Sequence, residues 1–118
     1  MNKIYHLGTC STCKRILSEI DTSNMELQDI KPSPITEKQL QELRELTTSY
    51  ESLFSKRAMK YKSLGLAEMN LAEEDYKKYL LLDYTFLKRP VAIVANEIFI
   101  GNSKKNVEAL KTKINELN

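Results

Sequence analysis

The sequence predicts one α/β domain in which two sheet-forming halves are separated by a helical insert. The first half has the pattern strand, helix, strand, and the last half has two strands followed by a helix. Between them, residues from about 35 to 85 carry mostly helical patterns. A chain of 118 residues with 42% hydrophobic content can bury one modest core. We therefore assign residues 1–118 to a single domain.

The first half is expected to form a β-α-β unit. Residues 3–7 make a short apolar strand that ends at the segment Gly-Thr-Cys-Ser-Thr-Cys-Lys-Arg. Apolar residues of the following helix recur at spacings of three and four: Cys13, Ile16, Leu17 and Ile20. After a turn at residues 21–24, residues 25–30 alternate apolar and polar side chains, as a half-buried strand does. Two strands joined by a helix are typically parallel, with a right-handed crossover.

The insert is expected to contain several short helices. Residues 32–34, Pro-Ser-Pro, end the second strand, and Thr36 can then cap a helix. That helix carries a spaced leucine series: Leu40, Leu43 and Leu46. A further helical piece should stop near Gly65, and Asn70 is expected to cap a last helix that ends near Leu82.

The last half is expected to form a hairpin followed by a helix. Residues 89–94 and 98–100 are rich in β-forming side chains, and the turn between them is too short for a crossover, so the strands should be antiparallel. Asn102 or Ser103 can cap the final helix. Its apolar stripe consists of Val107, Leu110, Ile114 and Leu117. A β-α-β half joined to a β-β-α half is the thioredoxin arrangement, here with a central helical insert.

Charge and hydropathy limit the partners and the compartment. Charged residues make up 29% of the chain but nearly cancel, to a net charge of +2, which gives no bias toward nucleic acid or a membrane surface. The N-terminus lacks the apolar core of a signal peptide, and no apolar run approaches the roughly 20 residues that span a bilayer. We expect a cytoplasmic monomer with no direct nucleic-acid or membrane partner. Thiols are kept reduced in that compartment, so a permanent disulfide is not expected.

The two cysteines, Cys10 and Cys13, could bind a metal, be buried as small hydrophobic residues, or do redox chemistry. Zinc needs about four ligands, and the chain offers only one soft ligand besides the cysteines, His6, so we expect no metal. Cys13 shares the apolar helix face and could be structural. Cys10 lies in a polar turn, where burial has no evident purpose.

The redox interpretation has a physical basis at Cys10. A cysteine that precedes a helix faces unpaired backbone N–H groups and the positive end of the helix dipole. Lys14 and Arg15 follow closely and also favour a negative sulfur. We therefore expect the pKa of Cys10 to be lowered and its thiolate to be the nucleophile.

The start of the same helix can also bind an anion. The N–H groups around Ser11 and Thr12 form a cradle for an oxyanion substrate or for charge that develops on an attacked centre. Cys13 lies one helical turn beyond Cys10, near enough to attack an adduct there and release it as an intramolecular disulfide.

Three segments together resemble a known family. Residues 8–15 (GTCSTCKR), 53–66 (LFSKRAMKYKSLGL) and 86–102 (FLKRPVAIVANEIFIGN) occur in this order and at these separations. They are similar to the glutaredoxin-linked arsenate reductases of the ArsC family and to the related Spx redox regulators. The resemblance covers nearly the whole chain and implies a thioredoxin-like domain with a helical insert, in agreement with the pattern above.

The resemblance implies roles for individual residues. It places the nucleophile at Cys10 and an arginine before a cis-proline at Arg89 and Pro90. Without it, Arg89 would be an ordinary solvated residue and Pro90 a strand opener. The family's reductases hold a tetrahedral oxyanion with arginines, and in the middle segment either Lys56 or Arg57 would take that place. The resemblance implies no bound cofactor, and glutathione with glutaredoxin, or thioredoxin, as electron donor and partner.

Two departures from the reductase pattern leave a second function open. The hairpin ends in Gly101 and Asn102, so the family's third arginine is absent, and a nearby lysine does not replace a guanidinium's bidentate grip. Glutathione-dependent reductases generally have a non-cysteine where this chain has Cys13, whereas Spx regulators use a C-x-x-C disulfide switch. The leading hypothesis is a thiol oxidoreductase that acts on a small oxyanion or thiol substrate. The alternative is a redox-switched regulator that binds the RNA polymerase α subunit.

Overall fold

The computed structural model describes residues 2–117 and divides the chain into two compact units, which are treated separately below. The first unit comprises Met1–Ser33 and Arg89–Asn118, and the second comprises Pro34–Lys88. The second unit spans the segment for which a helical insert was expected. The assignment of the chain to one domain stays a prediction.

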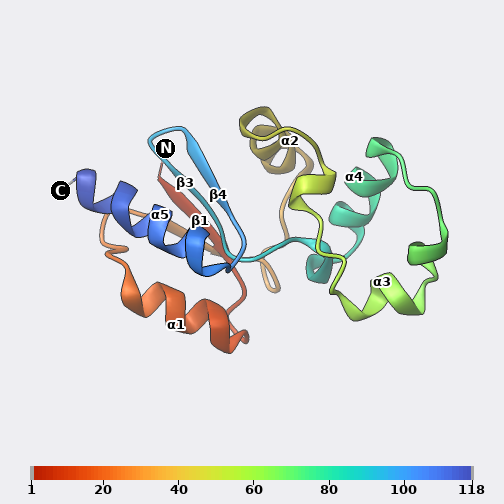
Figure 1. Ribbon diagram of the computed structural model, residues 1–118, viewed down its shortest axis with the longest axis horizontal. Helices are drawn as coiled ribbons and strands as arrows, with labels where there is room; N and C mark the ends of the chain where they lie inside the picture. The colour runs from red at the N-terminus through yellow and green to blue at the C-terminus, as the bar shows by residue number, and fades with distance from the viewer. Residues whose placement is uncertain (1, 118) are drawn as a thin grey trace. The chain divides into compact units, whose positions relative to one another are not determined.

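The first unit is built on a four-stranded mixed sheet with the order β2-β1-β3-β4 (Figure 1). Strand β1 pairs in parallel with β2, while β1 with β3 and β3 with β4 are antiparallel. The elements are β1 (Lys3–His6), α1 (Ser11–Glu19), β2 (Glu26–Asp29), β3 (Val91–Val94), β4 (Glu97–Ile100) and α5 (Lys104–Glu116). This confirms the predicted β-α-β and β-β-α halves and the thioredoxin-like α/β fold.

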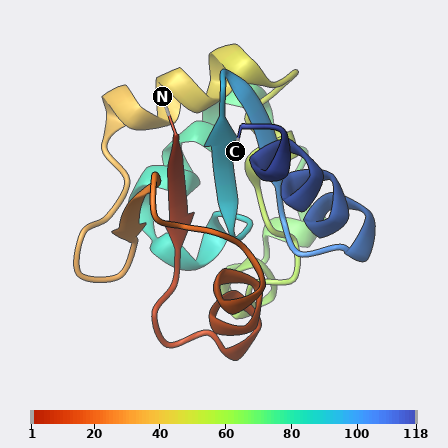
Figure 2. The ribbon, with the colours of Figure 1, turned by 90° about the vertical axis from the view of Figure 1, so that its left-hand side faces the viewer.

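Helices α1 and α5 cover the same face of the sheet (Figures 1 and 2). Side chains of β1, β3 and β4 that point to this face form the core with two residues of α5: Ile4, Ala92, Val94, Phe99, Leu110 and Ile114. Leu17 and Ile20, from the α1 stripe, and Met25 pack around it. The helical spacing read from the sequence therefore gives the face of each helix that meets the sheet.

The hairpin turn joins β3 and β4 through only two residues. Ala95 and Asn96 both have positive φ, 50° and 68°, as a type I′ turn requires. The side-chain Oδ1 of Asn2 accepts a hydrogen bond from the N–H of Ala95 at 3.0 Å, which links the turn to the start of β1. The antiparallel hairpin expected here is confirmed.

The second unit is helical and has an aromatic core. Its elements are α2 (Glu37–Leu46), η1 (Glu51–Leu53), α3 (Met59–Ser63), η2 (Leu66–Glu68), α4 (Glu73–Leu82) and η3 (Tyr84–Phe86), where η marks a 3₁₀ helix. Phe54 stacks on Phe86 with ring centroids 5.0 Å apart, and Tyr61 and Tyr76 meet Phe54 edge to face. Backbone hydrogen bonds join the two chain segments that carry the phenylalanines, since Ser55 donates to the carbonyl of Phe86 at 2.7 Å.

Helix starts in the second unit match the expectations in one case and not in another. Thr36 caps α2, as predicted, in a reciprocal capping box with Gln39. Asn70 does not cap α4, so that prediction was wrong. The helix begins after Ala72, whose N–H donates to the carboxylate of Asp75 at 2.8 Å. The side chain three residues into the helix thus satisfies the terminal donor without a capping residue of the usual type.

Two expected core positions are exposed instead. Leu27 is 45% exposed because β2 lies at the edge of the sheet, and Leu117 is 48% exposed beyond the end of α5.

Among residues 2–117, no helix combines the length and apolar character needed to cross a bilayer.

Candidate active site

The turn between β1 and α1 presents Cys10 at the start of the helix. The carbonyl of Leu7 accepts a hydrogen bond from the N–H of Cys10 at 3.0 Å, and the carbonyl of Cys10 accepts from the N–H of Lys14 at 3.0 Å. Cys10 is therefore the N-cap residue, with extended backbone angles.

The surroundings of Cys10 favour its thiolate. Burial opposes the charge, but the backbone N–H groups of Cys13 and Thr12, the Cys13 thiol and the positive charge of Arg89 together hold the pKa of Cys10 below its ordinary value. The lowered pKa expected from the helix start is thus present. The cradle differs slightly from the expected one, because the N–H of Cys13 acts beside that of Thr12.

Cys13 has the opposite character. Its side chain is fully buried, and burial raises its pKa to about 11. The negative charge on Cys10 and the hydrogen bond between the two sulfurs also raise the pKa of Cys13, while the backbone N–H of Leu7 and the charge of Arg89 act against this. Of the two thiols, Cys10 therefore loses its proton first, and Cys13 keeps its proton at neutral pH.

Arg89 and Pro90 directly precede β3, and the peptide bond between them is cis, as the resemblance implied. The carbonyl of Pro90 accepts a hydrogen bond from the N–H of Gly101 at 2.8 Å, which ties the proline to the end of the hairpin. Arg89 acts on both cysteines through its charge. The first unit thus brings together Cys10, Cys13, Arg89 and the start of α1.

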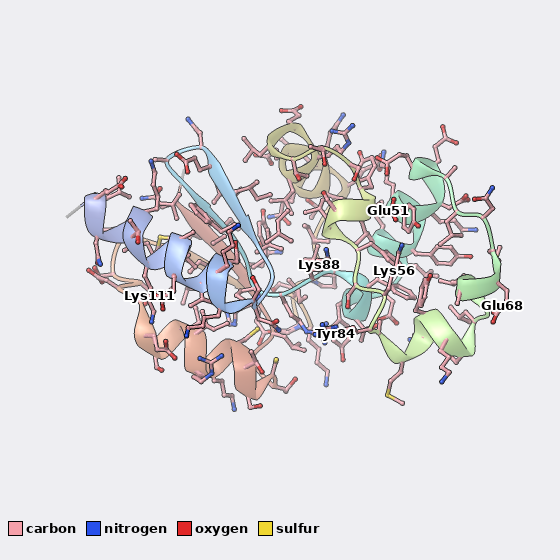
Figure 3. The ribbon with its side chains drawn as sticks, viewed as in Figure 1. Glu51, Lys56, Glu68, Tyr84, Lys88 and Lys111 are labelled. Carbon is pink, nitrogen blue, oxygen red and sulfur yellow. The ribbon has the colours of Figure 1, made fainter. Side chains whose placement is uncertain are left out.

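The cations next to the cysteines in sequence are not those that matter most. The guanidinium of Arg15 lies 2.9 Å from the carboxylate of Glu19, and Lys111 reaches from α5 to the same carboxylate at 2.7 Å (Figure 3). Arg15 is therefore part of a surface network that joins α1 to α5. Arg89, which is remote in sequence, contributes the positive charge at the two sulfurs.

The remaining predicted binding residues belong to different units of the chain. Ser11 is the first residue of α1 and is exposed. Lys56 and Arg57 belong to the second unit, where Lys56 lies 2.8 Å from the carboxylate of Glu51 (Figure 3). Among the described residues of that unit, Arg57 makes no hydrogen bond or ion pair. The role of Lys56 or Arg57 in substrate binding stays a prediction.

A metal site at the cysteines would need further ligands close by. Within residues 2–117, no three His, Cys, Asp or Glu side chains come together as a metal-binding group would require.

Solved structures of similar fold include ArsC-related proteins. An ArsC-family-related protein of Bacteroides fragilis is 22% identical, with a TM-score of 0.76 over 93% of this chain and 97% of that one. An arsenate reductase of Vibrio cholerae is 14% identical, with a TM-score of 0.75 over 96% of each chain. A Staphylococcus aureus protein is 24% identical, with a TM-score of 0.73 over 92% of this chain and 97% of that one. At these identities the likeness shows the fold.

The sequence comparisons bear on the family. A search of curated proteins gave no significant match. The model of the ArsC family matches residues 5–110, a span that includes the cysteine turn, the whole second unit and the β3-β4 hairpin. The chain therefore belongs to the ArsC family.

Proposed function

We propose that this protein is a thiol-dependent oxidoreductase of the arsenate-reductase kind, with Cys10 as nucleophile and Cys13 as resolving thiol. Membership of the ArsC family supports a thiol-dependent function of this kind. The observation that carries the proposal is the opposite character of the two cysteines. Cys10 has a lowered pKa at the start of α1, while Cys13 is buried and has a pKa of about 11.

The proposed cycle transfers two electrons. The Cys10 thiolate attacks the oxidised centre of the substrate, either the central atom of an oxyanion or one sulfur of a disulfide, and displaces hydroxide or a thiolate. Cys13 then gives up its proton and attacks the Cys10 sulfur. The bond from Cys10 to the substrate breaks, and its electron pair leaves with the reduced substrate. The product on the protein is a Cys10–Cys13 disulfide.

An external thiol must reduce that disulfide. Glutathione with glutaredoxin, or thioredoxin, can supply the two electrons by thiol exchange, and no bound cofactor is needed. Glutathione could also release the adduct directly from Cys10 and leave Cys13 unused. We propose that the protein acts this way as a monomer in the cytoplasm, where such donors are reduced.

Arg89 would stabilise the negative charge of an oxyanion. The positive charge that lowers the pKa of Cys10 can equally attract an anionic substrate to the N–H groups of Thr12 and Cys13. The similarly folded Vibrio cholerae protein is described as an arsenate reductase, which makes arsenate the first substrate to test. The hairpin end offers Gly101 and Asn102 rather than an arginine, so a disulfide substrate is the second.

The test is thiol-dependent turnover by the wild type, Cys10→Ser and Cys13→Ser. Arsenate with glutathione and glutaredoxin forms one assay, and a small disulfide with thioredoxin forms the other. We expect Cys10→Ser to be inactive in both assays. We expect Cys13→Ser to lose turnover with thioredoxin but to retain it where glutathione can release the adduct. Equal activity of Cys10→Ser and wild type would overturn the proposal.

The second candidate function is a redox switch, and one observation favours it. The two sulfurs share a hydrogen bond at the start of α1, so they are neighbours that an oxidant could join as a disulfide. In this alternative the Cys10–Cys13 disulfide changes a surface that binds a partner such as the RNA polymerase α subunit. A complex that forms only with the oxidised protein, in the absence of turnover, would support it.

A further inference from the structure

The turn that presents Cys10 is attached to the neighbouring strand. His6, the last residue of β1, lies opposite Asp29, the last residue of β2, and the N–H of Ile30 donates to the carbonyl of His6 at 2.9 Å. The turn to Cys10 begins directly after this pair. Asp29 is therefore placed beside the first residues of the turn, although it is remote from Cys10 in sequence.

The carboxylate of Asp29 holds the backbone at this point. It accepts hydrogen bonds from the backbone N–H of Lys31, at 3.2 Å, and from that of Gly8, within the turn. The Lys31 hydrogen bond lowers the pKa of Asp29 and is the largest effect, whereas partial burial raises the pKa. The Gly8 hydrogen bond and the charges of His6 and Lys31 lower the pKa further. The result is a lowered pKa, so Asp29 is ionised at neutral pH.

Gly8 has no room for a side chain because the Asp29 carboxylate occupies the space. A Cβ at position 8 would collide with Oδ2 of Asp29 and lie 3.3 Å from its Cγ. The positive-φ glycines of the described chain are Gly65 and Gly101, so Gly8 is not required here for a left-handed conformation. Its requirement is steric, and it depends on one carboxylate.

We propose that Asp29 is a positioning residue for the nucleophile. Its carboxylate accepts a hydrogen bond from the N–H of Gly8 and so fixes the turn from Leu7 to Cys10. The position of this turn directs the Cys10 sulfur toward the N–H groups of α1. The inference rests on the proposed function for the role of Cys10 as nucleophile. Asp29 itself touches no reacting atom and acts through the position of the turn.

The first test compares Asp29→Ala and Asp29→Asn in the full chain, with Glu26→Ala as control. Glu26 is a carboxylate at the other end of β2 that pairs with Lys3 at 3.1 Å. The readout is the rate of Cys10 alkylation by iodoacetamide across pH, with urea unfolding to monitor stability. We expect Asp29→Ala to raise the pKa of Cys10 and to slow alkylation at pH 7 about 3- to 10-fold. Asp29→Asn should lie between wild type and Asp29→Ala, because its single amide oxygen can accept only one of the two hydrogen bonds.

The second test uses the close approach of the two residues. Gly8→Ala introduces a methyl group that collides with Asp29 Oδ2. The double variant Gly8→Ala with Asp29→Ala has no such collision, but it still lacks the carboxylate that accepts the hydrogen bond from the N–H of residue 8. We expect the double variant to be more stable than Gly8→Ala and to titrate like Asp29→Ala. Should Gly8→Ala not fold, folding of the double variant alone gives the same result.

These outcomes are separable from failure of the proposed function. An unchanged Cys10 titration in Asp29→Ala would overturn the positioning role, as would a double variant no more stable than Gly8→Ala. Absence of wild-type turnover with arsenate or disulfides would reject the proposed reaction. The alkylation experiment would still test the effect of Asp29 on the pKa of Cys10, because alkylation does not require turnover.

Discussion

The thiol of Cys13 donates a hydrogen bond to the sulfur of Cys10 within the first turn of α1, and the pKa values of the two groups move in opposite directions. The hydrogen bond stabilises the Cys10 thiolate, and the same thiolate keeps the proton on Cys13. Attack on a substrate removes the charge from Cys10 and so weakens one of the causes that hold Cys13 protonated. This agrees with the proposed order of attack, in which Cys10 acts first and Cys13 second.

The buried thiol makes stability depend on pH in the alkaline range. The pKa of Cys13 is about 11 in the folded protein and near 9.0 in an unfolded chain, so between these values the folded state binds more protons. Stability from this group is complete below pH 9 and is lost as pH rises through 11, by up to about 3 kcal/mol. Urea unfolding with reductant should show this loss in wild type and not in Cys13→Ala. Equal pH dependence of the two proteins would contradict the assignment.

Arg89 should affect both thiolate formation and turnover. Arg89→Ala removes the positive charge that acts on Cys10, so the pKa of Cys10 should rise and kcat/KM should fall about 10- to 100-fold. Arg89→Lys should recover part of the loss, because lysine keeps the charge but not the planar guanidinium. Lys38→Ala, at an exposed position on α2, is the charge-matched control. Wild-type kinetics in Arg89→Ala would remove Arg89 from the site.

The two candidate cations of the middle segment should differ. Lys56 is held by Glu51 at 2.8 Å, and that hydrogen bond raises the pKa of Lys56, whereas no such partner holds Arg57 among the described residues of its unit. We expect Arg57→Ala to raise the KM for an oxyanion about tenfold and Lys56→Ala to change it little. Steady-state kinetics with arsenate would check this. The reverse order would assign the role to Lys56.

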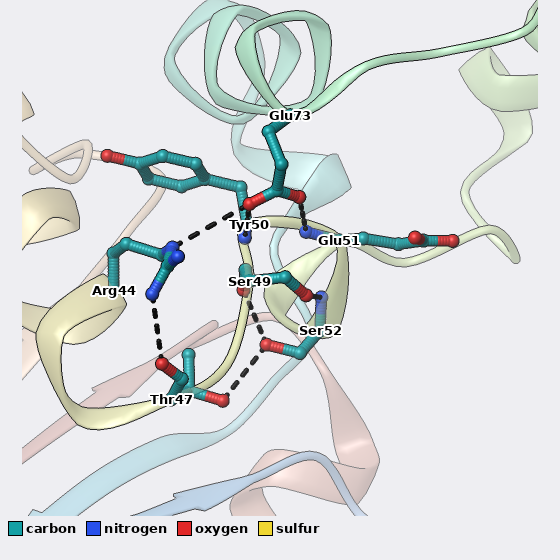
Figure 4. Close-up of polar contacts among 7 residues, drawn as sticks. All are labelled: Arg44, Thr47, Ser49, Tyr50, Glu51, Ser52 and Glu73. Carbon is teal, nitrogen blue, oxygen red and sulfur yellow. Dashed lines mark hydrogen bonds and ion pairs between the residues drawn. The ribbon is translucent and has the colours of Figure 1, made fainter.

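Glu73 should stabilise the second unit through three contacts (Figure 4). Its carboxylate accepts hydrogen bonds from the N–H groups of Tyr50 and Glu51, at 2.8 and 3.2 Å, and lies 3.6 Å from Arg44. Glu73→Ala leaves the start of η1 without these acceptors and should lower the free energy of unfolding by about 1 to 2 kcal/mol. Glu73→Gln should lose less, and exposed Glu74→Ala on the same helix should be near neutral. Equal stability of Glu73→Ala and Glu74→Ala in urea would show that the network is dispensable.

Local features of the fold could be predicted from the sequence. The Thr36 cap and the β3-β4 hairpin depend on residues adjacent in the chain, and both were predicted correctly. Asn70 was assigned wrongly because the Asp75 carboxylate satisfies the start of α4 by itself. Leu27 was expected to be half-buried, but only the order of strands shows that β2 lies at the edge.

In the candidate site, too, only the features that depend on neighbouring residues could be predicted from the sequence pattern. The position of Cys10 before a helix followed from spacing alone, and the lowered pKa followed from that position. Nothing in the sequence singles out Asp29, because its contact with Gly8 depends on the register between β1 and β2. Arg89 was identified through the resemblance to the family, since nothing local in the sequence distinguishes it from a solvated residue.

The most direct test of the account is the pH dependence of Cys10 alkylation in wild type, Cys13→Ser and Cys13→Ala, with each modified thiol identified by mass spectrometry. We predict that Cys10 reacts with a pKa below 9.0 in wild type, while Cys13 stays unmodified at neutral pH. Cys13→Ala, which removes the hydrogen-bond donor, should raise the pKa of Cys10 more than Cys13→Ser. An ordinary pKa for Cys10 in wild type, or modification of Cys13 before Cys10, would contradict the central claim that Cys10 is the nucleophile.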